Sequence, residues 1–134
     1  MLRTICYISD SRLNNSLNAF DSLTLKAKKN NATNNITGLL VYKNNNFLQV
    51  LEGKHETVDA VFNKISLDNR HHNIFKIIDT TIEQRFFGEY NFGFTVVSDK
   101  NALKNLTEYL NWLRIADNMI ANEISTMVEN FISR

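Results

Sequence analysis

The amino-acid sequence predicts a mixed α+β fold built from one sheet with helices. Three observations predict it. The 134 residues fit one domain of ordinary size. Runs rich in β-branched and aromatic residues are interleaved with two segments whose apolar residues recur at helical spacing. The last third of the chain has helical periodicity alone, which adds helices after the sheet is complete.

The first half of the chain alternates strand and helix signals. Residues 2–9 form a β-branched and aromatic run that is typical of a strand. Apolar residues then recur at helical spacing over 17–27, which predicts a helix that ends near Asn30. Residues 36–42 and 47–52 are predicted strands, and an asparagine-rich turn between them predicts a hairpin.

The second half adds one more helix, two strands and the C-terminal helices. Apolar residues at i, i+3, i+4 and i+7 over 58–65 predict the clearest helix of the chain. Residues 74–81 and 90–97 are predicted strands. Two amphipathic helices follow over 103–113 and 120–131, with a break at the Asp-Asn pair between them.

This order of elements matches a ferredoxin-like βαββαββ sheet, in which both crossover helices cover one face. The strand over 36–42 is apolar on both of its faces, so both faces of the sheet need cover. The C-terminal helices can cover the second face, and a partner subunit is the alternative. We therefore expect a sheet domain over residues 1–98 and a helical extension over 99–134 that packs on the sheet.

Composition narrows the classes of function and the compartment. The 15 Lys and Arg balance 14 Asp and Glu, which argues against direct nucleic-acid binding, since such domains are strongly basic. The single cysteine, Cys6, can form no internal disulfide, so we expect a reduced, cytoplasmic compartment. No apolar run reaches the ~18–20 residues of a membrane span, so we expect no membrane partner.

Motifs of the common enzyme classes do not occur in the sequence. It contains no GxGxxG, no phosphate-binding P-loop and no GxSxG, which leaves nucleotide-binding loops and hydrolase nucleophiles without support. The three histidines have neither a second cysteine nor a histidine four residues away. We therefore expect no metal site.

Two polar residues stand among the apolar residues of predicted strands, and they carry more information. By the two-residue period of a strand, Tyr7 and Gln49 each point to a largely apolar face. If the two strands are neighbours, both side chains face one space between the helices, and Asn31 reaches its rim. Two interpretations stay open here: a satisfied polar cluster in the core, or a slot for a flat ring, lined by Leu23, Ala27 and Ile65.

Tyr7, Asn31 and Gln49 belong to a series of short motifs that follow one another over residues 2–97. The motifs are Cys6-Tyr7-x-Ser9, Asn31-x4-Ile36-Thr37-Gly38, Phe47-x-Gln49-x-Leu51-Glu52-Gly53, Asp68-x-Arg70-His71, Arg85-x-Phe87 and Tyr90-x-Phe92-Gly93-Phe94. In order and spacing they resemble the BLUF family, flavin-binding sensors of blue light. Residues 99–134 match that family only in architecture.

The resemblance implies FAD, bound non-covalently between the two crossover helices. It implies that Tyr7 donates an electron and a proton to the excited flavin, that Gln49 relays the proton, and that Asn31 holds the ring. It further implies that Leu23 and Ile65 sandwich the ring, and that the ribityl side of the cofactor is met by Asp68, Arg70 and His71.

The implied function is that of a photoreceptor and not of an enzyme. Rearranged hydrogen bonds at Gln49 give a red-shifted signalling state, which passes to a downstream regulator protein and decays in the dark. We also expect a homo-oligomer. A small flavin-dependent oxidoreductase on the same fold is the alternative, because a fold alone does not fix a function. The joint presence of Tyr7, Asn31 and Gln49 argues against a light-blind interaction module.

The sequence departs from the family pattern in its last strand. Members often have Trp and Met where this chain has Tyr90 and Phe92. We expect these two residues to take part in signal relay, with an intact photocycle but altered dark recovery or output. A Phe92→Met variant with unchanged recovery and output would contradict this expectation. We also expect Tyr90 to place a second phenol near the site, where it competes as an electron donor.

Overall fold

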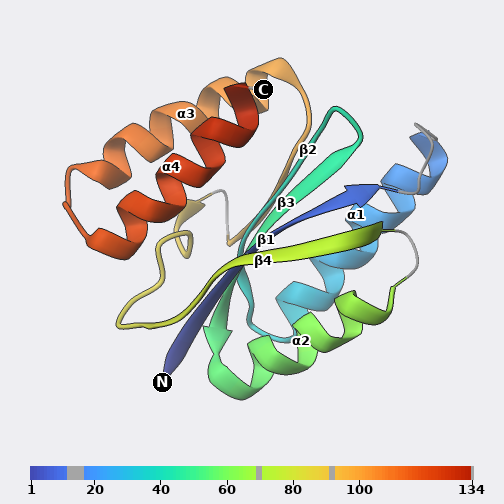
Figure 1. The fold of residues 1–134 in the computed structure, drawn as a ribbon, viewed down its shortest axis with the longest axis horizontal. Helices are drawn as coiled ribbons and strands as arrows, with labels where there is room; N and C mark the ends of the chain where they lie inside the picture. Colours follow the sequence, from blue (N-terminus) through green and yellow to red (C-terminus); the bar gives the residue numbers. More distant parts are fainter. Residues whose placement is uncertain (12–16, 69–70, 91–92, 134) are drawn as a thin grey trace.

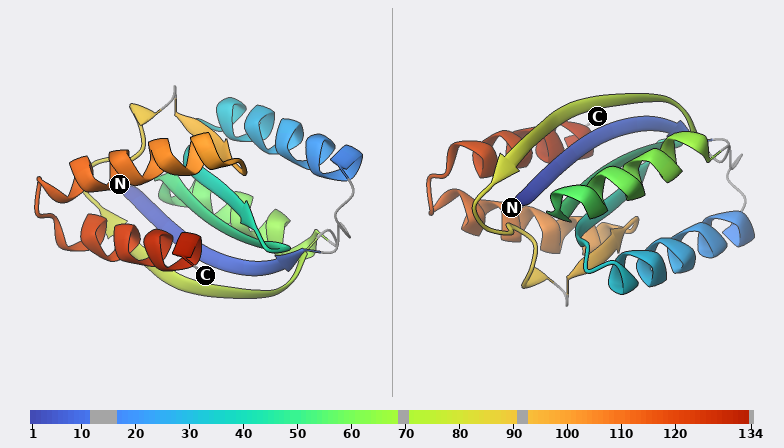
Figure 2. Two further views of the ribbon diagram at one scale, coloured as in Figure 1. Left: turned by 90° about the horizontal axis from the view of Figure 1, so that it is seen from above. Right: turned by 90° about the horizontal axis from the view of Figure 1, so that it is seen from below.

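A computed structural model describes residues 1–11, 17–68, 71–90 and 93–133 of the protein. They form three layers, with one sheet in the middle and a pair of helices on each side (Figures 1 and 2). In chain order the elements are β1 (Leu2–Ser11), α1 (Leu17–Thr33), β2 (Thr37–Lys43), β3 (Asn46–Lys54), α2 (His55–Leu67), β4 (His71–Ile82), β5 (Phe94–Val97), α3 (Lys100–Arg114) and α4 (Met119–Ser133).

The sheet has the predicted ferredoxin-like topology, with strand order β4-β1-β3-β2-β5. β1 pairs antiparallel with both β3 and β4, and β3 pairs antiparallel with β2. β5 is parallel to β2 at the other edge. The first and third strands are thus central neighbours, which is the condition for Tyr7 and Gln49 to face one space. Residues at the middle of β1 and β3 are therefore surrounded by backbone on both sides.

β2 confirms that both faces of the sheet are covered. Leu39 and Val41 are fully buried in one apolar cluster with residues of α3 and α4. Leu40, between them, is 4% exposed and lies in a cluster with Phe47 and Leu23 of α1 on the opposite side. The C-terminal helices thus pack on the face that α1 and α2 leave free, as Figure 1 shows.

The break between the two C-terminal helices falls where the sequence predicts it. Asp117 has a positive φ of 51°, and the Asn118 Oδ1 accepts hydrogen bonds from the first backbone N–H groups of α4, at Ile120 and Ala121. The Asp99 side chain caps α3 in the same manner, 2.8 Å from the Ala102 N. Across the described ranges, every helix is too short or too polar to span a membrane.

The predicted strand over 90–97 is wrong at Tyr90 and Gly93, since β5 begins at Phe94; residues 91–92 lie outside the described residues. The backbone N of Tyr90 donates to the Phe87 O over 3.2 Å, and the N of Gly93 donates to the Tyr90 O over 3.0 Å. These are turn hydrogen bonds within the segment, and they replace the ladder of a strand. Gly93 adopts a φ of +113°, which an extended strand does not allow.

Candidate functional site

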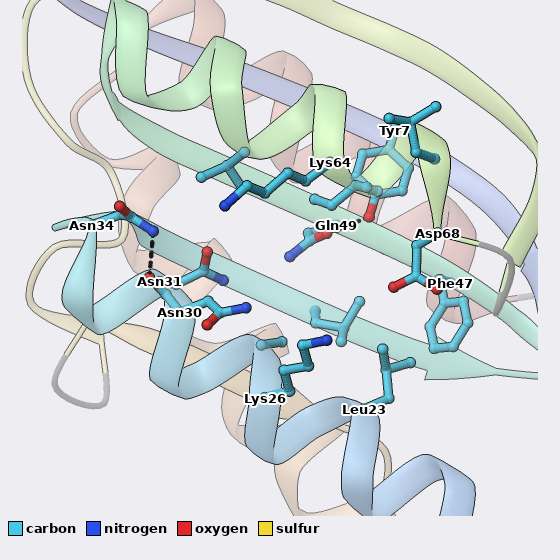
Figure 3. Close-up of a pocket in the computed structure, with 15 residues that line it drawn as sticks. Tyr7, Leu23, Lys26, Asn30, Asn31, Asn34, Phe47, Gln49, Lys64 and Asp68 are labelled. Carbon is cyan, nitrogen blue, oxygen red and sulfur yellow. Dashed lines mark hydrogen bonds between the residues drawn. The ribbon is translucent and has the colours of Figure 1, made fainter.

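A cavity of about 380 Å³ lies between α1, α2 and the sheet (Figure 3). This volume is in the range of small-molecule sites, which is about 300–1,000 Å³. Its floor is the face of the sheet that carries Tyr7, Leu40, Phe47 and Gln49. Its two walls are the facing sides of α1 and α2. The slot that the sequence left as one of two interpretations is therefore present.

Tyr7 and Gln49 lie side by side on the floor of the cavity. They are direct partners across β1 and β3, which places both side chains on one face of the sheet. The Tyr7 Oη donates a hydrogen bond to the Gln49 Oε1. Tyr7 is 1% exposed and Gln49 is 4% exposed. The expectation that these two side chains meet is confirmed.

The surroundings of Tyr7 keep its phenol protonated. Burial raises the pKa of the Tyr7 phenol well above its usual value, and the negative charge of Asp68 raises that pKa further. The edge of the Phe62 ring packs against the Tyr7 ring, with centroids 5.6 Å apart. Tyr7 is thus a neutral donor at every ordinary pH, and its proton is directed to the Gln49 Oε1.

Two amide groups face the cavity with atoms left unpaired. Within the described part of the chain, the Gln49 Nε2 and both polar atoms of the Asn31 side chain make no hydrogen bond, although Asn31 is only 3% exposed. Both side chains point into the cavity in Figure 3. Buried amides are normally paired. The cavity therefore fits a ligand with donors and acceptors along a flat edge, as the ring of a flavin has.

Asn31 is held in place by the end of its helix. Its backbone carbonyl accepts from the Ile36 N over 2.8 Å, and the Asn35 that follows the helix has a positive φ of 54°. This turn ends α1 and directs the chain into β2. The side chain of Asn31 is left on the inner side of the last turn, next to the sheet.

The walls of the cavity are aliphatic and face each other. Leu23 and Ala27 come from α1, while Val61 and Ile65 come from α2. The four-residue spacing on each helix brings each pair to one side of its helix. The walls fit the two faces of a flat aromatic ring. The structure brings Leu23 and Ile65 to the same cavity as Tyr7, Gln49 and Asn31, as the resemblance implies.

The remaining expected site residues are placed in different ways. Asp68 lines the cavity at the end of α2. His71 is the first residue of β4, but its side chain lies outside the described residues, and so does all of Arg70. Phe92 also lies outside them. Roles for these residues stay predictions.

The expectation for Tyr90 is wrong, because Tyr90 does not add a phenol to the face of the sheet that carries Tyr7 and the cavity. Its ring lies in the apolar cluster with α3 and α4, where its centroid is 4.5 Å from that of Tyr109 and 6.3 Å from that of Phe87. The strand alternation assumed for 90–97 does not hold at Tyr90, which lies in a turn before β5 begins. The sheet separates Tyr90 from Tyr7.

Sequence reasoning missed several polar residues that line the cavity. Lys26 and Asn30 on α1 and Asn34 just after its end form a stripe at four-residue spacing, and Lys64 faces them from α2 (Figure 3). The available signal was that stripe, which runs beside Leu23, Ala27 and Asn31 on the same helix. Lysines on a helix are usually solvated, so the pattern was not informative alone. Lys26 and Lys64 together give one part of the cavity a positive charge.

The comparisons with known proteins show which family the chain resembles. A family model described as "BLUF: Sensors of blue-light using FAD" matches residues 2–93. The "Blue light- and temperature-regulated antirepressor BluF" of Escherichia coli K12 is 30% identical over 89 residues, which are 66% of this chain and 22% of that protein. The "Photoactivated adenylate cyclase subunit alpha" of Euglena gracilis is 33% identical over 87 residues, 65% of this chain and 8% of that protein.

Solved structures show the same relationship over most of the chain. The structure "BlsA photo-activated state" has a TM-score of 0.70 and 26% identity, and covers 93% of this chain and 91% of that one. "BlrB - a BLUF protein, dark state structure" has a TM-score of 0.70 at 24% identity over 94% of this chain and 96% of that one, which supports the fold. This chain spans 22% or less of the curated relatives named above. By the family match and by its fold, the chain belongs to the BLUF family of flavin-binding blue-light sensors.

Proposed function

We propose that the cavity between α1 and α2 holds FAD, and that Tyr7 and Gln49 convert the absorption of blue light into a change of hydrogen bonding. The observation that carries this proposal is the buried Tyr7–Gln49 hydrogen bond beside unpaired amide atoms in the cavity. A core that needed no ligand would pair those atoms within the protein.

The residues of the cavity supply three kinds of contact. Leu23 and Ile65, on the two facing walls, would pack against the two faces of the ring. The Asn31 amide and the Gln49 Nε2 would hydrogen-bond its polar edge. Lys26 and Lys64 supply positive charge among the polar residues of the cavity and would hold the phosphates. Asp68 lines the same cavity, and from the family resemblance we propose that Arg70 and His71 complete this end.

A bound flavin supplies the absorption of blue light and, once excited, an oxidant strong enough to take an electron from a phenol. Tyr7 is the phenol placed to give that electron. An oxidised phenol is strongly acidic, so the Oη proton leaves readily, and the Gln49 Oε1 is its hydrogen-bond acceptor. The electron and proton then return to Tyr7. Gln49 is left rotated or in its other tautomer, with changed hydrogen bonds along its free edge.

The change at Gln49 is the signal, and the chain acts as a sensor and not as an enzyme. Stronger hydrogen bonds to the ring shift its absorption slightly to the red until the amide returns in the dark. We propose that the sensor unit covers residues 1–98, and that residues 99–134 pass the change to a downstream regulator protein. Relatives named as an antirepressor and as cyclase subunits support such an output. We further propose a cytoplasmic location and a homo-oligomer.

We also propose that Tyr90 and Phe92, which precede β5, take part in passing the signal. The Tyr90 ring is in contact with the Tyr109 ring of α3, which supports a role of this ring, and not of the Tyr90 hydroxyl, in passing the signal to that helix. Phe92 is included through the family pattern alone, at the position where members often have Met.

The proposed function is tested by absorption spectra of the purified protein in the dark and directly after blue light. We expect a flavin spectrum that shifts slightly to the red and returns in the dark. Chromatography of the released cofactor against FAD and FMN standards identifies the flavin. A bound flavin that bleaches to its reduced form would instead support the oxidoreductase. A protein that binds neither flavin after reconstitution would contradict the proposal.

A further inference from the structure

A buried carboxylate lies on β3, three residues after Gln49 and on the other face of the sheet. Glu52 is fully buried. Its Oε1 accepts from the Thr37 Oγ1 over 2.7 Å and from the Phe87 N over 2.8 Å, and its Oε2 accepts from the Phe86 N over 2.8 Å. A fully buried carboxylate is costly unless it is paired in this way. Glu52 thus fastens the segment after β4 to the sheet.

Arg85 strengthens the same attachment. Its Nη1 donates to the Thr37 Oγ1 over 2.8 Å and to the backbone O of Glu52 over 3.0 Å. Burial raises the pKa of Glu52, while the hydrogen bonds and the charge of Arg85 oppose that rise. We call residues 85–90 the connector. One side of the connector is bound to β2 and β3 by directional polar contacts.

The other side of the connector is bound to α3. The Tyr109 Oη donates a hydrogen bond to the backbone O of Phe86. The Tyr109 ring also packs on the rings of Tyr90 and Phe87, at centroid distances of 4.5 Å and 5.8 Å. The peptide groups of Phe86 are therefore held from both sides, by Glu52 at the N–H and by Tyr109 at the carbonyl.

These contacts make a continuous hydrogen-bonded path from β3 to α3. The rest of the contact between the sheet and the C-terminal helices is an apolar cluster, and apolar packing has little directional preference. Hydrogen bonds in a chain orient and polarise one another. A displacement of β3 at Gln49 is therefore passed to α3 with a defined direction through Glu52, Phe86 and Tyr109.

We propose that Glu52 and Tyr109 are positioning residues of the output route, which couple the flavin side of β3 to α3 through the connector. This inference rests on the proposed function, because it needs a light-driven change at Gln49. It goes beyond that function by naming the contacts through which the change leaves the sheet. The route does not require the Trp and Met that this chain lacks at positions 90 and 92.

The test uses Tyr109→Phe in the full chain loaded with flavin. The variant keeps the ring and removes the hydroxyl that holds the Phe86 carbonyl. Tyr90→Phe is the matched control, because it removes a hydroxyl from a ring that packs directly on Tyr109. The Tyr90 hydroxyl makes no hydrogen bond to any described residue. Two quantities are measured on each sample: the red shift after blue light, and the light-minus-dark hydrogen exchange of the α3 backbone.

We expect the unchanged protein and Tyr90→Phe to show the red shift together with an exchange difference in α3. Tyr109→Phe keeps the full red shift and loses the exchange difference. Glu52→Gln gives the same result, since its amide puts a donor where a backbone N–H already donates. Glu52→Gln also replaces Tyr109→Phe as the test if the latter does not fold.

Three results would overturn the inference while the proposed function stands. The red shift could occur with no exchange difference in α3, or Tyr109→Phe and Glu52→Gln could keep that difference in full. Alternatively, Tyr90→Phe could lose it as completely as Tyr109→Phe, which would show that the loss is not specific to the hydrogen bond between Tyr109 and Phe86. A flavin-loaded protein without a red shift would contradict the proposed function, and this inference with it.

Discussion

The two faces of the sheet are packed in different ways. On the α3 and α4 side, one continuous apolar cluster runs from Cys6 to Phe131. On the α1 and α2 side, the core is divided into two smaller clusters with a cavity of about 380 Å³ beside them. Protein interiors are close-packed, so a void of this size between two helices calls for an occupant. We propose that the incompletely filled face binds the flavin and that the filled face stabilises the domain.

The polar residues differ between the faces as well. On the cavity side, the Gln49 Nε2 and the Asn31 side-chain amide make no hydrogen bond to any described residue and are open to a ligand. On the other side the buried Glu52 carboxylate is satisfied by donors from the protein itself. The polar groups on the first face are arranged to bind a ligand. The carboxylate on the second face is arranged to hold one segment of the chain in place.

The largest effect that distinguishes the faces is expected from Gln49→Leu. Leucine fits the apolar floor but neither accepts from Tyr7 nor presents an amide to the cavity. We expect the red shift after blue light to disappear, while circular dichroism shows an intact fold. Gln84→Leu, at an exposed position, is the control and keeps the shift. A Gln49→Leu protein with the normal red shift would contradict the role given to the amide.

The next effect compares a leucine from each face. Leu106 is fully buried in the α3 and α4 cluster, so Leu106→Ala is expected to lower the free energy of unfolding by about 2–5 kcal/mol. Leu23 lines the cavity and is half-buried, so Leu23→Ala costs less stability but weakens flavin binding. Denaturant titration and flavin titration measure the two quantities. If Leu106→Ala and Leu23→Ala lose the same stability and bind flavin equally well, the two faces do not differ in function as we propose.

A smaller effect is expected at the rim of the cavity. Asn31→Ala removes both polar atoms that we assign to the polar edge of the flavin ring. The expected loss in flavin affinity is about tenfold, which corresponds to about 1.4 kcal/mol. Asn63→Ala, at an exposed position of α2, is the control. If titration of the apoprotein gives the same affinity for both variants, Asn31 does not contact the flavin.

The smallest effect lies at the edge of the sheet, away from both functions. Arg3 hydrogen-bonds Asp79 through Nε over 2.6 Å and lowers the pKa of that carboxyl. A lowered pKa in the folded state adds stability above the unfolded value of about 3.9, and the gain is lost as the pH falls below it. Because the pair is partly exposed, we expect at most about 1 kcal/mol. In Asp79→Asn we expect the free energy of unfolding to fall less steeply with decreasing pH in this acidic range. An unchanged fall would exclude the Arg3–Asp79 pair as its source.

Strand periodicity was enough to predict the floor of the site. The two-residue period placed Tyr7 and Gln49 on one face, and the apolar character of β2 on both sides required the cover that α3 and α4 provide. Helical spacing placed Leu23 and Ile65 on the walls. These predictions succeeded because each depends on a regular element, in which the sequence position determines the direction of the side chain.

Other features could not be obtained from the sequence. Tyr90 was expected near the flavin, but residues 83–90 form turns, and no period relates position to direction in turns. The partners of Glu52 are backbone N–H groups 34 and 35 residues away, which carry no residue-type signal. Lys26 and Lys64 have the same sequence appearance as solvated lysines elsewhere. Their place at the cavity depends on how α1 and α2 pack.

The hydrogen bond between Tyr7 and Gln49 is tested most directly by light-minus-dark absorption of a Tyr7→Phe variant. Phenylalanine keeps the ring and its packing against Phe62, and removes the hydroxyl that donates to Gln49. Tyr42→Phe, which removes a phenol that donates to Asn45, is the control. We expect Tyr7→Phe to bind flavin and to show no red shift, while Tyr42→Phe responds as the unchanged protein does. A full red shift in Tyr7→Phe would contradict the assignment of Tyr7 as the electron and proton donor.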